Sequence, residues 1–100
     1  MSRRIILSIN NKPIDIDYFV QGFIDHTTGG IIEALEGTGK IKTLQIIVEA
    51  NEVKINLNDA VVPINTFVNK IIRNTLFGMI SSLKGVDKID RLEINVERFD

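Results

Sequence analysis

The chain contains an internal repeat, and this repeat constrains the fold more than any other feature of the sequence. A shift of 48 positions aligns residues 5–49 with residues 53–97 without a gap, and 16 of these 45 pairs are identical. Background composition would give about three identities, on the order of one pair in fifteen. The identical residues are mostly apolar residues and glycines, as a shared fold requires. We therefore predict a single domain, residues 1–100, made of two βαβ repeats at 5–49 and 53–97.

Each repeat is predicted to begin and end with a strand. Residues 4–9 and 52–57 alternate apolar with other side chains at period two, and so do residues 43–48 and 91–97. Turn residues follow the first strand of each repeat.

These turn residues are the pairs Asn10-Asn11 and Asn58-Asp59. Both residue types tolerate positive φ, which predicts tight hairpins and a very short returning strand after each turn. Ala50-Asn51 is a short link between two strands and predicts a third hairpin.

A helix is predicted in the middle of each repeat, where the apolar period changes to 3.6. Asp15 or Asp17 and Asn65 are candidate N-caps, and Gly37 and Gly85 lie where a left-handed residue ends a helix. We expect one stripe of each helix to be buried against the sheet. The residues of this stripe are Ile16, Phe19, Val20, Phe23, Ile24, Thr27, Ile31, Ala34 and Leu35 in the first helix, and Ile64, Phe67, Val68, Ile71, Ile72, Thr75, Met79, Ser82 and Leu83 in the second.

The order β-α-β-β-α-β predicts an α+β fold, the ferredoxin-like split β-α-β sandwich. Two helices would cover one face of a four-stranded, mainly antiparallel sheet with an internal pseudo-two-fold axis, in the spatial order fourth, first, third, second strand. The other face would meet solvent, because its side chains are mostly polar. They are Ser8, Thr43, Gln45, Lys54, Asn56, Arg91, Glu93, Asn95 and Glu97.

Composition excludes several classes of function. Twelve Lys and Arg against thirteen Asp and Glu leave a net charge of −1, which gives no general reason to bind nucleic acid or an anionic membrane. There is no Cys and one His, so thiolate and multi-His metal sites within one chain are excluded. We predict a cytoplasmic protein without a metal, a cofactor or catalytic residues.

Two short motifs are set aside. Gly37-Thr38-Gly39-Lys40 is a fragment of a phosphate loop, but it follows a helix instead of preceding one, so a helix cap and turn are favoured. His26 stands next to Asp25, and a His–carboxylate pair is a possible acid–base unit. No Ser or Cys nucleophile accompanies it, and a surface histidine is the favoured interpretation.

The first helix is unusually rich in glycine. Gly22, Asp25, His26 and Gly29 form a small and polar stripe at i, i+3, i+4 and i+7. A glycine inside a helix costs about 1 kcal/mol relative to alanine. Two explanations remain open: the helix kinks near residues 27–30, or another backbone approaches it closely.

The second helix has a wide apolar arc. Leu76, Phe77 and Ile80 extend it beyond what one sheet needs, which is typical of a partner surface. Alternatively, Leu76 and Ile80 fill the seam between the helices. The candidate partner contacts are Gly22, Asp25, His26, Gly29, Leu76, Phe77 and Ile80.

The second repeat carries a resemblance. The run Lys54-Ile-Asn-Leu-Asn-Asp-Ala-Val-Val-Pro-Ile-Asn-Thr-Phe-Val, continued by Ser81-Ser-Leu-Lys-Gly85, resembles a family of small prokaryotic proteins of unassigned function that pair a strand and turn with a helix ending in Leu-Lys-Gly. The resemblance covers about half the chain and implies a duplicated βαβ architecture. It carries over no functional residue.

Three functions are ranked. The first is a small non-catalytic interaction or regulatory module that self-associates, as a homodimer. The second is a small-molecule binding module that uses the turns at Asn10-Asn11-Lys12 and Asn58-Asp59. The third is a hydrolase that uses His26 with Asp25 or Glu33.

Overall fold

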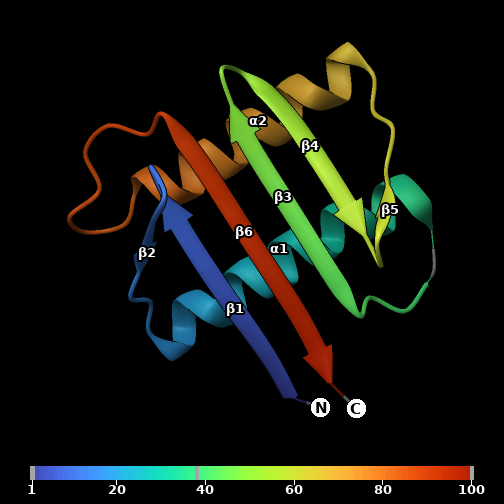
Figure 1. Cartoon of the computed structure of the whole chain (residues 1–100), viewed down its shortest axis with the longest axis horizontal. Helices are drawn as coiled ribbons and strands as arrows, with labels where there is room; N and C mark the ends of the chain where they lie inside the picture. The colour runs from blue at the N-terminus through green and yellow to red at the C-terminus, as the bar shows by residue number, and fades with distance from the viewer. Residues whose placement is uncertain (1, 38, 100) are drawn as a thin grey trace.

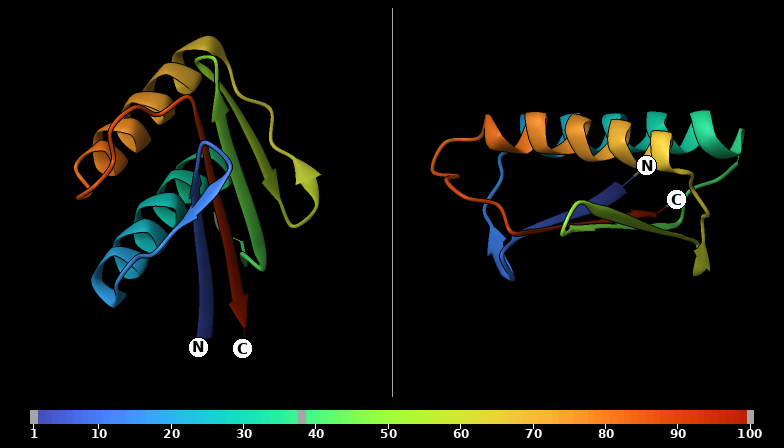
Figure 2. Two further views of the ribbon diagram at one scale, coloured as in Figure 1. Left: turned by 60° about the vertical axis from the view of Figure 1, so that its left-hand side comes forward. Right: turned by 90° about the horizontal axis from the view of Figure 1, so that it is seen from above.

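The computed structural model describes residues 2–37 and 39–99, and it has two helices and six strands in one antiparallel sheet (Figure 1). The expected α+β class is confirmed. Both helices lie on one face of the sheet (Figure 2). The elements are β1 (Ser2–Ile9), β2 (Lys12–Ile14), α1 (Tyr18–Glu36), β3 (Thr43–Glu49), β4 (Glu52–Leu57), β5 (Ala60–Val61), α2 (Thr66–Ser81) and β6 (Arg91–Phe99).

The strand order differs from the expected one. The sheet runs β2-β1-β6-β3-β4-β5, so the four main strands lie in the order first, fourth, second, third. The prediction of four strands in the order fourth, first, third, second is therefore wrong. Each half of the chain still contributes two strands separated by one strand of the other half: β6 lies between β1 and β3, and β3 lies between β4 and β6.

The hairpin turns explain this order. Asn10, Asn11, Asn58 and Asp59 all have φ between 49° and 68°, which is the left-handed backbone of a two-residue hairpin turn. These turns fold β2 onto one edge of β1 and β5 onto one edge of β4. β1 and β4 then each have a single edge left for pairing with another main strand. In the expected order, β1 and β4 would both be central and would need two.

Two asparagines also fix the loop that leads into each central strand. Asn10 Oδ1 accepts hydrogen bonds from the backbone N–H groups of Asp90 and Arg91 at 2.7 and 2.9 Å, and its Nδ2 donates to the Lys88 carbonyl at 2.9 Å.

Asn58 makes the equivalent three bonds in the loop before β3, and each bonded residue precedes the corresponding partner of Asn10 by 48 positions. Its Oδ1 accepts from Lys42 and Thr43 at 2.8 and 3.0 Å, and its Nδ2 donates to the Lys40 carbonyl at 2.9 Å. Each turn side chain therefore connects its own hairpin to the start of a central strand.

The core is aliphatic and lies between the sheet and the two helices. The central pair Ile46 and Ile94 face each other across β3 and β6 and are fully buried. The other buried apolar residues are Ile5, Leu7, Ile9, Ile24, Ile32, Ile41, Leu44, Val48, Val53, Ile55, Val62, Ile72, Leu76, Ile80, Leu92 and Val96. No aromatic residue belongs to this core, although the chain has five Phe and one Tyr.

The helix ends match the expected signals in part. Asp17 and Asn65 are the N-caps, and their side chains accept from Val20 N and Val68 N. Gly37 has φ 80° and ends α1. The helix α2 ends earlier, at Ser81, and Gly85 with φ 85° lies in the turn beyond it.

The first and last strands are neighbours. β1 and β6 pair antiparallel from Ser2 opposite Phe99 to Ile9 opposite Leu92, so the start of β1 and the end of β6 lie side by side (Figure 1). In the described part of the chain, neither helix is long and apolar enough to cross a lipid bilayer.

The asparagine clamps give the first prediction. Asn10→Gly and Asn58→Gly keep the left-handed turn but remove three hydrogen bonds each, so we expect each to lower the free energy of unfolding by about 1–3 kcal/mol. Urea denaturation measures the change. Asp59→Gly is the matched control, because its side chain has no partner among the described residues; a loss as large as that of Asn58→Gly would contradict the clamp.

The open sheet face gives the second prediction. Glu93 accepts hydrogen bonds from Asn95, Arg91 and Gln45. The bond from Asn95 first, then those from Arg91 and Gln45 and the Arg91 charge, hold the pKa of Glu93 below its ordinary value of 4.5, against the opposing effect of burial. This stabilisation is present above pH 4.5 and is lost as the pH falls through the folded-state pKa.

We therefore expect Glu93→Gln to shrink the drop in unfolding free energy between neutral pH and about pH 3. Urea denaturation at both pH values measures it. An unchanged drop in Glu93→Gln would refute the role of Glu93.

Candidate functional site

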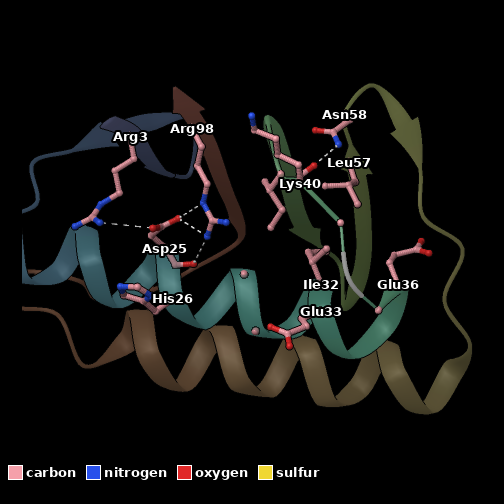
Figure 3. A pocket seen from close by; sticks show the side chains of 15 residues that line it. Arg3, Asp25, His26, Ile32, Glu33, Glu36, Lys40, Leu57, Asn58 and Arg98 are labelled. Carbon is pink, nitrogen blue, oxygen red and sulfur yellow. Dashed lines mark hydrogen bonds and ion pairs between the residues drawn. The ribbon is translucent and has the colours of Figure 1, made fainter. Parts of the chain in front are cut away.

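A cluster of two arginines and one aspartate joins α1 to the ends of β1 and β6 (Figure 3). Asp25 lies on the sheet-facing side of α1, and its side chain is 7% exposed. Arg98 Nε donates to Asp25 Oδ1 at 2.9 Å, and Nη2 donates to the Asp25 backbone carbonyl at 3.3 Å and forms an ion pair with Oδ1 at 2.8 Å. Arg3 Nη1 lies 3.6 Å from the other carboxylate oxygen, Oδ2.

Two glycines of α1 make room for these guanidinium groups. A Cβ on Gly29 would lie 2.7 Å from Arg98 Nη2, and a Cβ on Gly22 would lie 3.1 Å from Arg3 Nη2. The close approach expected at the glycine stripe is therefore real, but arginine side chains make it and not another backbone. α1 is continuous through residues 27–30, so the kink is not observed.

The other half of the chain has no such cluster. The positions 48 residues away from Arg98 and Arg3 are Ala50 and Asn51, which form the turn between β3 and β4. The position that corresponds to Asp25 is Arg73, which stacks on Phe77 at 4.3 Å from the ring centroid. The cluster exists only where β1 and β6 continue past the point at which the other two strands turn.

A cavity of about 760 Å³ opens beside this cluster, between α1, the loop that follows it and the sheet (Figure 3). We call it the arginine cavity. Its lining residues are Arg3, Asp25, His26, Gly29, Gly30, Ile32, Glu33, Glu36, Gly37, Gly39, Lys40, Ile41, Leu57, Asn58 and Arg98. Of the phosphate-loop fragment, Gly37, Gly39 and Lys40 line the cavity, and Thr38 lies outside the described residues.

His26 does not form an acid–base pair in this arrangement. It is exposed, as expected, and its ring lies apart from the Asp25 carboxylate, which points toward the two arginines (Figure 3). The Asp25 carboxylate is bound by Arg98. No hydrogen bond joins His26 to Asp25 or Glu33 in the described part of the chain.

The two turns predicted as ligand sites are occupied by structural contacts. The amides of Asn10 and Asn58 are used in the clamps described above. Asn58 nevertheless lines the arginine cavity. One predicted site residue therefore lies at the cavity, but its side-chain amide is already hydrogen-bonded to the backbone.

The predicted partner residues of the second helix lie mostly in the core. Leu76 and Ile80 have no exposed surface, so they are unavailable to a partner and fill the interior, as the alternative interpretation proposed. Phe77 is half-buried against the core. Asp25 is also buried, which leaves His26 as the exposed polar member of the predicted set.

A different apolar surface is exposed. Phe19, Phe23, Phe67 and Ile71 are 72%, 51%, 68% and 48% exposed. We call these four residues the helix face. Each lies five residues from one buried residue of its helix and nine from another, which at 3.6 residues per turn is about 140–180° around the helix axis. They therefore point away from the sheet.

The prediction that these four residues belong to the buried stripe is wrong, and so is the same prediction for Ala34, Thr75 and Ser82, which are exposed. Apolar residues surround most of each helix, and steps of three and four residues connect Phe19 and Phe23, through Val20, to the buried Ile24 without placing them on one side. A flat sheet covers only one arc of a helix, so the remaining apolar residues stay at the surface. Tyr18, at 82% exposed, adds to this surface.

Sequence reasoning also missed Arg3 and Arg98 as site residues. One signal was present: two glycines seven residues apart flank an aspartate in α1, and each glycine is explained by an arginine. The expected strand order already placed the first and last strands side by side, but it did not give the register that brings Arg3 opposite Arg98.

Comparisons with protein-family models, with curated protein sequences and with solved structures find no match. The resemblance of residues 54–85 to small prokaryotic proteins is therefore unsupported by a family assignment, and the site has to be interpreted from its own geometry.

The glycines of α1 give the third prediction. Gly30 has open space where a Cβ would be, whereas a Cβ on Gly29 would meet Arg98. We expect Gly30→Ala to raise the free energy of unfolding by up to about 1 kcal/mol and Gly29→Ala to lower it, although the intrinsic helix propensity gain is the same. Denaturation at one protein concentration compares the two variants. Equal gains in the free energy of unfolding would contradict the prediction, because Arg98 would then move aside for the new Cβ at no cost in stability.

Proposed function

We propose that this protein is a small non-catalytic interaction module that self-associates as a symmetric homodimer through the helix face. The observation that carries the proposal is the position of the aromatic residues. Aromatic side chains usually dominate cores and interfaces. Among the described residues no aromatic side chain is fully buried here: Phe77 packs half-buried against the core, and the other five are exposed.

The exposed apolar area fits a dimer interface. At about 150–250 Å² per aromatic side chain, the exposed parts of Phe19, Phe23, Phe67 and Ile71 amount to roughly 450 Å². A standard interface buries about 800 Å² per partner, of which about 57% is apolar. The helix face of one protomer therefore supplies about the apolar area that such an interface needs.

The other surfaces fit self-association less well. The strands at the two sheet edges are short, with three and two residues, Pro13 lies within β2, and Pro63 follows β5. Short edge strands and prolines discourage edge-to-edge pairing. The open sheet face carries the hydrogen-bonded polar side chains Gln45, Asn56, Glu93 and Asn95, which would lose water on burial.

The arrangement of the helix face supports a symmetric partner. Phe19 and Phe67 are 48 residues apart, as are Phe23 and Ile71. Equivalent patches on α1 and α2 would allow α1 of one protomer to pack on α2 of the other, which is the isologous contact of a two-fold dimer.

We also infer that the chain arose by duplication of a βαβ unit, with its halves related by a pseudo-two-fold axis. The strand registers support it. A shift of 48 positions turns each residue pair between β1 and β6 into a position pair between β4 and β3, and in both strand pairs the two residue numbers add to 101. The repeated asparagine clamps and the repeated N-caps support it as well. The interleaved strands resemble the ferredoxin-like split, in a different strand order.

The fourth prediction tests self-association. We expect the wild-type chain to be a dimer at high micromolar concentration, and Phe19→Lys with Phe67→Lys in one chain to weaken dimerisation at least about 100-fold, or 2.7 kcal/mol. Sedimentation equilibrium measures it. Val61→Lys is the matched control, because Val61 is 76% exposed on β5, away from the helix face.

Two outcomes would overturn the proposal. One is a wild-type chain that stays monomeric throughout this concentration range. The other is a Val61→Lys variant that dissociates as much as the double variant. Denaturation at low concentration checks that both variants remain folded.

A further inference from the structure

We propose that the arginine cavity binds a small molecule that carries a carboxylate or a phosphate group on an apolar body, and that Arg3 and Arg98 hold the anionic group. The cavity lies beside the sheet-facing side of α1, so the proposal is independent of the helix face and of dimerisation.

The Arg3–Asp25–Arg98 cluster at one end of the cavity has an excess of positive charge. Two guanidinium groups, with side chains 25% and 23% exposed, share the single carboxylate of Asp25. Arginine remains charged in proteins, and a half-buried charge without a full counter-ion is unfavourable. A ligand anion would supply the missing negative charge.

The two arginines also have unused hydrogen-bond donors. Arg98 uses Nε and Nη2 on Asp25, and its Nη1 makes no hydrogen bond in the described part of the chain. The nearest carboxylate oxygen lies 3.6 Å from Arg3 Nη1, which is too long for a hydrogen bond. The Arg3 guanidinium donates no hydrogen bond to residues 2–37 or 39–99. Five donors in a planar fork suit an oxyanion.

Both guanidinium groups are held in place before any ligand arrives. Arg98 is fixed by its hydrogen bonds to Asp25 Oδ1 and to the Asp25 carbonyl, and by the ion pair with the carboxylate. Arg3 lies over the Tyr18 ring, at 5.6 Å from the centroid, and in the space that Gly22 leaves. Fixed side chains lose less entropy on binding, which raises affinity.

The rest of the cavity suits an apolar body. Ile32 and Ile41 are buried core residues with an edge in the cavity, and Leu57 completes this wall. The volume of about 760 Å³ falls within the range of about 300–1,000 Å³ that small-molecule sites occupy.

The other charged residues that line the cavity are mixed in sign. Glu33, Glu36 and Lys40 also line the cavity, so the positive excess is confined to the end that holds Arg3 and Arg98. A ligand with one anionic end therefore has a preferred orientation, with that end toward β1 and β6.

The experiment is a titration of the full chain at constant ionic strength, followed by amide chemical shifts in NMR. Three anions are compared: inorganic phosphate, phenyl phosphate and benzoate, with benzylamine as the cationic control. We expect saturable shifts at Gly22, Gly29 and Gly39, tighter binding of the two aromatic anions than of inorganic phosphate, and no such shifts with benzylamine. If phenyl phosphate binds more tightly than benzoate, the site prefers a phosphate group; if benzoate binds more tightly, it prefers a carboxylate.

Variants separate a binding site from a structural cluster. Arg3→Gln should weaken binding at least about tenfold, because it removes a charged donor. Asp25→Asn should tighten it, since it removes the competing negative charge while the amide oxygen can still accept from Arg98 Nε and keep that side chain in place; a purely structural cluster gives no reason for tighter binding. Arg4→Gln is the matched control, because Arg4 is 65% exposed in the same strand and pairs with Glu97.

Three results would overturn the proposal. They are an absence of saturable shifts with every anion, equal affinities of Arg3→Gln and the wild type, and weaker anion binding by an Asp25→Asn variant that denaturation shows to be as stable as the wild type. Arg98→Gln is unsuitable, because it leaves the buried Asp25 carboxylate without its hydrogen bonds and so tests folding.

Discussion

The left-handed two-residue turns at Asn10-Asn11 and Asn58-Asp59 determine how this sheet is assembled. Each turn places a short strand on one edge of a main strand and so leaves that strand a single free edge. β1 and β4 are thereby moved outward, and β3 and β6 become the centre of the sheet. The same asparagine side chains hold the loops that enter β3 and β6, so a local backbone preference and a long-range contact act together.

Much of this architecture could be predicted from the sequence because it depends on local patterns. The period of two, the period of 3.6, the N-caps Asp17 and Asn65 and the three turns are properties of short segments. The strand order is not. The turns at Asn10-Asn11 and Asn58-Asp59 were recognised, but their short returning strands were not counted as neighbours of β1 and β4, and that count decides between the two orders.

The two surfaces of interest were harder to predict for different reasons. Phe19 and Phe23 satisfy the spacing rule of a buried stripe, and only the limited arc that a sheet can cover excludes them from the core. The arginine cavity depends on residues from three elements. Gly22 and Gly29 appeared as unexplained costs in a helix, and their explanation required the positions of Arg3 and Arg98, which lie 95 residues apart in sequence and opposite each other in the sheet.

The adjacent ends of β1 and β6 have a consequence for how the chain could be rearranged. Linking these ends and opening the β3–β4 turn at Ala50-Asn51 would produce a circular permutant that starts in the second half and finishes in the first. The matching registers of the two strand pairs would let this permutant rebuild the same sheet. Its new linker would start and end beside Arg3 and Arg98, so the rearrangement that leaves the scaffold intact would alter the surroundings of the arginine cluster, which has no counterpart at positions 50, 51 and 73.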